Sequence, residues 1–143
     1  MKIAKLLQEE LEYLEYKRTE RETNAFANKF LKPAYKVKTE ELRAFLRKYY
    51  GQDFRKLHID QDTIRRYIRG MEYGLFLKTI YWRAVALTVK EQSGFRCAAC
   101  GRKTRVLQVH HLIYDNHGDE LHNTGDLVCL CESCHKKAHK KFS

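Results

Sequence analysis

The segments Cys97-Ala98-Ala99-Cys100-Gly101 and Cys131-Glu132-Ser133-Cys134 decide how the C-terminal part of this chain folds. Two residues between paired cysteines allow a tight turn to direct both thiolates at one metal ion, and two such turns complete a tetrahedral set. We therefore predict that the four cysteines hold a structural zinc ion. Four unconnected thiols are rarely paired in this way, and a redox pair is disfavoured because no βαβ pattern surrounds either motif.

The residues between and after these cysteine pairs predict a small ββα unit. Short apolar runs at 106–109 and 127–130 indicate two strands, a polar loop covers 115–119, and residues 132–141 indicate a basic helix. The fifth cysteine, Cys129, alternates with Val128 and Leu130 in an apolar run, so we interpret it as a buried strand residue and not as a ligand.

The rest of the chain predicts a helical region. Apolar residues at spacings of three and four indicate an amphipathic helix at 3–16, while residues 17–38 are basic, less periodic and contain the only proline, Pro33. Further helices are expected over 39–50 with Thr39 as N-cap, from about Asp60 onward, and over 79–92. The fold class is therefore mainly α, with a helical region at 1–78 and the ββα unit within 79–143.

The composition favours a polyanionic partner. The chain carries 28 Lys and Arg against 18 Asp and Glu, a formal net charge of +10, and such charge releases counterions from nucleic acid. We find no apolar run long enough to span a bilayer, and the N-terminus is too short and too acidic for a signal peptide. These features predict an intracellular protein without a membrane partner, whose thiols stay reduced and available to a metal.

Four histidines carry the case for chemistry. His110 and His111 follow the first predicted strand, His135 follows Cys134 directly, and His139 lies one helical turn further on. If one zinc gathers the cysteine pairs, His135 is carried close to the end of the hairpin. His110 and His135 could then share a second metal, while His111 points elsewhere as a base.

With these cysteine pairs and histidines, the chain resembles the HNH endonucleases, and within them the zinc-knuckle proteins that are common in phages and bacteria. The resemblance covers about residues 79–143, including Tyr81-Trp82-Arg83. It rests on four motifs in the expected order: Cys97-x2-Cys100, Val109-His110-His111-Leu112-Ile113-Tyr114, Asp126-Leu127-Val128-Cys129-Leu130-Cys131 and Cys134-His135-x3-His139. It implies a ββα-metal (His-Me finger) unit.

The resemblance also implies a role for each matching residue. His111 corresponds to the general base that activates water, and His110 and His135 correspond to two ligands of a catalytic divalent metal. Neutral imidazole is a competent base near pH 7, and an ion held by two imidazoles keeps open positions for a phosphate. Mg, Mn, Ni or Zn could serve as the catalytic metal beside the structural zinc.

Asp126 is the departure from the family pattern, because it stands where the family carries its middle Asn. It could brace the ββα loop or ligate the metal, and Asn123 is the alternative for that Asn. Glu120 lies where many relatives carry Glu, and its role is open. His58, His117 and His122 are interpreted as incidental.

Basic residues supply candidates for contact with DNA. Arg65, Arg66 and Arg69 lie on one side of a predicted helix, and the final helix carries His139, Lys136 and Lys140. Alternatively, the lysines do not contact DNA and only form a solvated basic end of the helix. In the same way, His139 could simply occupy a solvated position on that helix. The helical region at 1–78 is expected to position the protein on duplex DNA.

The sequence thus predicts a cytoplasmic, metal-dependent DNA endonuclease of a bacterial or phage-infected cell, which nicks or cuts DNA. One alternative is a zinc-stabilised protein that binds nucleic acid or inhibits without cleavage. Another is a nuclease subunit of a phage or defence complex, where a protein partner sets specificity. The His110, His111 and His135 set favours the enzyme, since a binder has no need of it.

Overall fold

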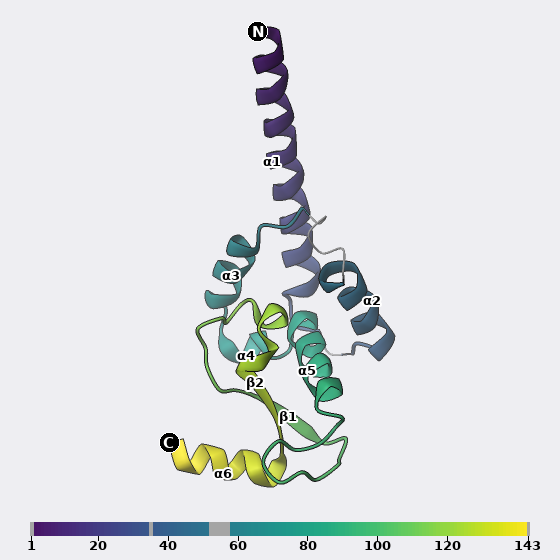
Figure 1. The fold of residues 1–143 in the computed structure, drawn as a ribbon, viewed down its shortest axis with the longest axis vertical. Coiled ribbons are helices and arrows are strands. Elements are labelled where there is room, and N and C mark those ends of the chain that lie inside the picture. Colours follow the sequence, from purple (N-terminus) through teal and green to yellow (C-terminus); the bar gives the residue numbers. More distant parts are fainter. Residues whose placement is uncertain (1, 35, 52–57, 143) are drawn as a thin grey trace.

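The computed structural model describes residues 2–34, 36–51 and 58–142, and for residues 139–142 it describes the helical backbone alone. These residues form a mainly helical protein with one small two-stranded sheet and a four-cysteine cluster, which confirms the predicted fold class. The long helix α1 (Lys2–Phe30) extends away from the rest of the molecule, which gathers around its C-terminal half (Figure 1).

Helix α1 is longer than the predicted helix at 3–16. Residues 17–30, which looked less periodic, continue the same helix, because Lys, Arg and Glu have high helix propensity without any apolar stripe. Only the last turns bury side chains, namely Thr23, Phe26 and Phe30, and the chain leaves the helix just before Pro33.

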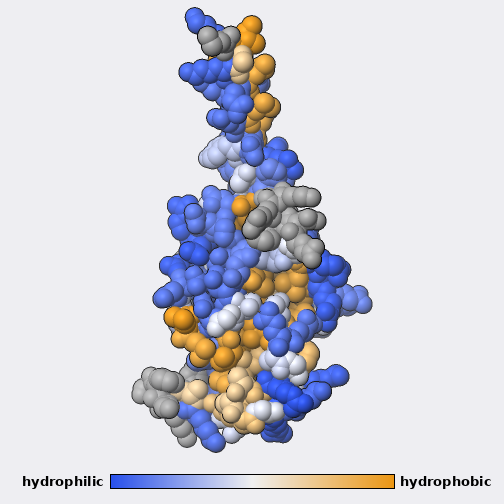
Figure 2. All heavy atoms as spheres, viewed as in Figure 1, coloured by the Kyte–Doolittle hydropathy of each residue, from blue (hydrophilic) through white to orange (hydrophobic). Residues whose placement is uncertain are grey.

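The predicted apolar stripe of α1 exists but packs against no other part of the described chain. Ile3 is 74% exposed and Leu11 is 61% exposed, and the neighbouring leucines are similarly open. Figure 2 shows this stripe as an apolar edge running along the projecting helix. The N-terminal half of α1 therefore contributes little to the core.

The core begins where the end of α1 meets α2 (Thr39–Tyr50). Phe26, Phe30, Phe45 and Tyr49 form an aromatic cluster with ring centroids 4.7–5.8 Å apart, a range in which such rings attract one another. The prediction of Thr39 as N-cap was wrong by one residue, because Lys38 takes this position without a side-chain cap and Thr39 is the first helical residue.

Three further helices link this cluster to the sheet. Helix α3 (Gln61–Arg69) starts at Asp60, whose carboxylate accepts hydrogen bonds from the amides of Asp62 and Thr63. A short helix α4 (Tyr73–Phe76) leads into α5 (Ile80–Gln92), which Thr79 caps through the amide of Trp82. The predicted helix starts near Asp60 and at Thr79 are confirmed, with the capping interactions that those residue types favour.

The sheet is a hairpin of β1 (Leu107–His111) and β2 (Leu127–Cys131), paired antiparallel with His111 opposite Leu127. Two 3-10 turns, η2 (Glu120–His122) and η3 (Thr124–Asp126), lie in the connection, and α6 (Glu132–Phe142) follows β2 directly. Buried side chains from the helices and from the hairpin form one continuous cluster. Among the described residues, no helix is both long and apolar enough to cross a membrane.

The exposed start of α1 gives a test of this arrangement. Deleting residues 2–15 should change the free energy of unfolding by less than about 1 kcal/mol, because only exposed side chains are lost. Urea denaturation of the full and shortened chains would measure the difference. A clearly larger loss of stability would show that these side chains are packed against something in solution.

Candidate active site and zinc centre

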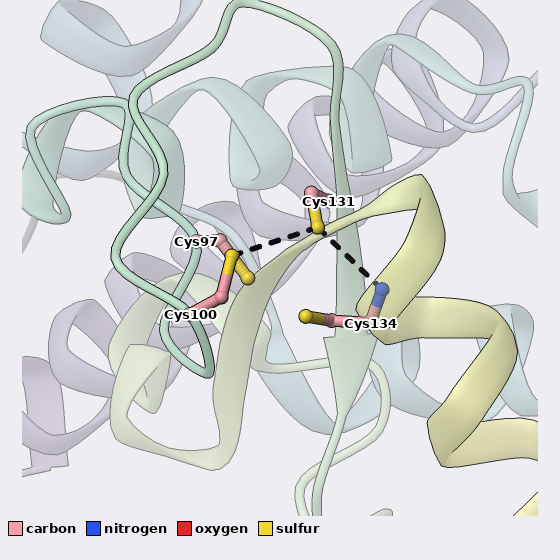
Figure 3. A group of neighbouring side chains, drawn as sticks. All are labelled: Cys97, Cys100, Cys131 and Cys134. Atoms are coloured by element: carbon pink, nitrogen blue, oxygen red, sulfur yellow. Dashed lines mark hydrogen bonds between the residues drawn. The ribbon is translucent and has the colours of Figure 1, made fainter.

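The four predicted zinc ligands come together at the end of the hairpin. The Sγ atoms of Cys97, Cys100, Cys131 and Cys134 all lie within 4.8 Å of one another, and their side chains converge (Figure 3). The sulfurs of Cys100 and Cys131 are 3.8 Å apart. Zn–S bonds of about 2.3 Å place the sulfurs of a tetrahedral site about 3.8 Å apart. The donor set and its spacing therefore fit zinc.

The backbone around this cluster shapes both turns. The amide of Gly101 donates to the carbonyl of Cys97 at 2.9 Å, and Gly101 has a φ of +75°, a conformation that glycine adopts without strain. The amide of Ala98 donates to the carbonyl of Cys129 at 2.8 Å, which attaches the first turn to β2. Cys129 itself is buried in the core, as predicted for a strand residue.

The thiols interact strongly. Burial raises the pKa of the Cys97 thiol, but backbone amide donors and the Cys100 thiol outweigh it and lower that pKa to about 6. Hydrogen bonds to the sulfurs of Cys131 and Cys97 raise the pKa of Cys134 to about 12, because the proton is shared among neighbouring sulfurs. Four thiolates this close repel one another, so a cation is needed to hold all of them deprotonated.

Cys97→Ala should abolish zinc binding and unfold the C-terminal ββα unit, because the binding free energy of a structural zinc is part of the folding free energy. Zinc content by atomic emission and near-ultraviolet circular dichroism would measure both effects. Cys129→Ala is the matched control, since it removes a buried cysteine outside the cluster and should keep the zinc. Equal zinc in the two variants would contradict the assignment.

A cleft of about 460 Å³ opens between α5, β1 and α6, and three of the predicted catalytic histidines line it. His110 and His135 reach it from β1 and α6, with ring centroids 5.5 Å apart. Two imidazoles on one tetrahedral ion, with metal–nitrogen bonds of about 2.0–2.1 Å, have ring centres roughly 5 Å apart. This pair therefore fits the predicted second metal, with open positions left toward the cleft.

His111 follows His110 in β1 and lines the same cleft, but it is more buried than His110. It is only 4% exposed, and its ring is stacked between Trp82 and Tyr114 with centroids at 5.0 and 4.6 Å. Both ring nitrogens have partners: Nδ1 lies 3.1 Å from the hydroxyl of Tyr73, and Nε2 lies 3.1 Å from a carboxylate oxygen of Glu120. The predicted base is thus held rigidly.

Glu120 connects the residues of this arrangement. It is a charged residue, yet it is almost fully buried, with an exposed fraction of 2%. Oε2 lies 3.1 Å from Nε2 of His111 and 2.7 Å from Nδ1 of His117, while Oε1 accepts from the Tyr81 hydroxyl and the Gly118 amide. Burial raises the pKa of Glu120, but the hydrogen bonds from the two histidines outweigh it and lower that pKa to about 2. The carboxylate is therefore ionised at neutral pH.

His117 was interpreted from the sequence as incidental, and the structure shows otherwise. It shares the Glu120 carboxylate with His111, and the three side chains lie close enough to hold a metal ion. Each distance also suits a hydrogen bond to an ionised carboxylate, which satisfies the buried charge without an ion. No spacing rule marked this histidine, because its loop carries no regular period.

The loop that carries His117 and Glu120 rests on helix α3. Gly118 has a φ of +99°, and a Cβ atom there would lie 2.8 Å from the Cα of Arg65, so a larger residue does not fit. The guanidinium of Arg69 donates to the carbonyls of Asp115 and His117 at 2.7 and 3.0 Å. Helix α3 thus fixes the loop that holds the predicted base.

Arg65 and Arg69, which the sequence suggested as phosphate contacts, make contacts within the chain. Arg65 forms an ion pair with Asp119 at 3.5 Å, Arg69 holds the loop, and Arg66 donates to Thr63 within α3. Their contact with DNA stays a prediction. Lys136 is exposed and forms an ion pair with Glu132. The side chains of His139 and Lys140 lie outside the described ones, so their predicted contacts stay open.

Asp126 makes the contacts expected of a bracing residue. Its carboxylate accepts from the side-chain amide of Asn116 at 2.8 Å, and its carbonyl accepts from the amide of Leu112 at 2.8 Å. These bonds connect the two ends of the loop next to the hairpin. The alternative, Asn123, donates to the carbonyl of Asp119 at 2.8 Å and so also holds this loop.

Replacing Glu120 tests the buried network. Glu120→Gln should lower the free energy of unfolding by about 1–3 kcal/mol, because an amide puts an NH₂ group against two imidazole donors. The lowered pKa means that the carboxylate stabilises the fold fully above about 4.5, and less as pH falls toward about 2. Denaturation between about pH 7.5 and 9, above the range in which histidines ordinarily take up a proton, should therefore show a constant difference between the two proteins. A difference that disappears within this range would contradict an ionised carboxylate.

Comparison with known proteins identifies the segment that contains these features. Residues 97–141 match the profile of the HNH endonuclease family, which confirms the resemblance seen in the sequence. The match includes all four cysteines and the histidines of β1 and α6. No curated protein and no solved structure matches the chain.

Proposed function

We propose that this protein is a metal-dependent DNA endonuclease of the HNH type. The observation that carries the proposal is the cleft lined jointly by His110, His111 and His135, inside the segment that matches the HNH endonuclease family. Cleavage of the phosphodiester bond would leave a 5′-phosphate and a 3′-hydroxyl.

His111 is the general base in this proposal. The ionised Glu120 carboxylate holds its ring in one orientation and stabilises the imidazolium that forms when His111 takes a proton from the attacking water. Trp82 and Tyr114 stack on its two faces and fix the ring plane. The base therefore needs no reorganisation before it reacts.

His110 and His135 would hold the catalytic divalent metal. When bound, such an ion supplies Lewis-acid stabilisation of the negative charge that develops on the phosphate. Imidazole ligands suit Zn, Ni or Mn, and a site with only two protein ligands also accepts Mg. A structural zinc held by Cys97, Cys100, Cys131 and Cys134 would hold β2 and the start of α6 against the turn at Cys97, and so keep His135 near His110.

The net charge of +10 supports DNA as the substrate, because clustered lysines and arginines attract the phosphate backbone. The exposed side chain of Lys136 and the basic face of α3 are the proposed contacts. The helical region at 1–78 would position the chain on the duplex. A zinc-stabilised protein that binds without cutting is the alternative, and a subunit of a larger phage or defence complex is another.

Plasmid relaxation tests the function. The wild type should nick or linearise supercoiled plasmid with at least one of Mg, Mn, Ni or Zn, and His111→Ala should lower the rate by about 10²-fold or more, because acid–base catalysis is lost. Agarose gels at several enzyme concentrations would measure the rates.

Zinc content is the control for this experiment. His111→Ala should retain the zinc of the wild type, because His111 lies outside the cysteine cluster. Absence of cleavage with all four metals would favour the binding protein. Equal cleavage by the wild type and the variant would exclude His111 as the base.

A further inference from the structure

The hydrogen bonds around His111 determine which of its nitrogens can accept a proton. An ionised carboxylate can only accept hydrogen bonds, so Nε2 of His111 must carry the proton that it shares with Glu120. In the neutral ring, the lone pair is then on Nδ1. The atom that faces this lone pair is the hydroxyl oxygen of Tyr73, at 3.1 Å.

Tyr73 belongs to helix α4, outside the segment that matches the HNH family. Burial and a hydrogen bond with Tyr114 raise the pKa of Tyr73 above its ordinary value, so the hydroxyl keeps its proton at neutral pH and can donate it to Nδ1. Tyr73 is 41% exposed and lines the cleft, whereas the side chain of His111 is only 1% exposed. Tyr73 is therefore more open to solvent than the imidazole with which its hydroxyl interacts.

We propose that Tyr73 is a further catalytic residue, whose hydroxyl relays the proton of the attacking water to Nδ1 of His111. This inference rests on the proposed nuclease function. Under this proposal, a residue of the helical region at 1–78 takes part in the reaction itself and not only in contact with DNA.

In the relay, a proton moves from the attacking water through Tyr73 to His111. The O–H bond of the attacking water breaks and its proton passes to the Tyr73 oxygen, while the former Tyr73 proton passes to Nδ1. The resulting hydroxide forms a new P–O bond as the bond from phosphorus to the 3′ oxygen breaks. The 3′ oxygen takes a proton from solvent, and the imidazolium, stabilised by Glu120, later returns its proton through the same hydroxyl.

Tyr73→Phe tests the relay, because it removes one oxygen and keeps the ring that packs near His111, Tyr114 and His117. The single-turnover cleavage rate at saturating enzyme should fall roughly 10- to 100-fold, within reach of the usual contribution of acid–base catalysis. The Kd for the uncut plasmid and the zinc content should not change. Ser93→Ala is the control, since it also removes one hydroxyl but lies at the end of α5, outside the cleft and the cysteine cluster, and this variant should cleave at the wild-type rate.

Each other outcome overturns the relay. An unchanged rate would show that the hydroxyl only packs, and a faster rate would show that it blocks the water. A slower rate with weaker DNA binding or lost zinc would assign Tyr73 to binding or to the fold. If the wild type itself does not cut with any of the four metals, the proposed nuclease function is contradicted as well. If the wild type cuts and Tyr73→Phe cuts at the same rate, only the relay is contradicted.

Discussion

The buried carboxylate of Glu120 is the interaction on which the site depends. A charge at 2% exposure is tolerated only when hydrogen-bond donors surround it, and this one draws donors from α5, from β1 and from its own loop. Because the partners come from separate parts of the chain, satisfying one charge also sets the positions of the elements. The orientation of His111 follows from this requirement.

The four-cysteine cluster has a different role, which is to stabilise the C-terminal ββα unit. The hairpin and α6 bury little apolar surface of their own, and four thiolates around one zinc ion would add to the core that they share with the helices. A zinc ion on the four cysteines would fix His135 near His110, and Glu120 holds His111, the next residue of the same strand. The four-cysteine cluster and the hydrogen bonds of Glu120 would therefore position the proposed metal ligands and the proposed base separately.

Much of this arrangement could be predicted from the sequence. The cysteine pairs gave the zinc cluster, and the order of motifs gave the hairpin and the positions of His110, His111 and His135. The length of α1 was missed, because periodicity detects a buried face and residues 17–25 are mostly exposed. The roles of His117, Glu120 and Tyr73 could not be predicted. They depend on contacts between residues that lie 3 to 39 positions apart, without any repeating interval.

The contacts of Tyr81 and Trp82 connect the matched segment to the helix before it. The segment at 97–141 matches the family, but one hydrogen-bond partner of Glu120, Tyr81, and one of the two rings stacked on His111, Trp82, precede it. An isolated copy of that segment would keep the four clustered cysteines, but it would lose the Tyr81 hydroxyl that donates to Glu120 and the Trp82 ring that stacks on His111. The segment that matches the family therefore does not contain every side chain that positions His111.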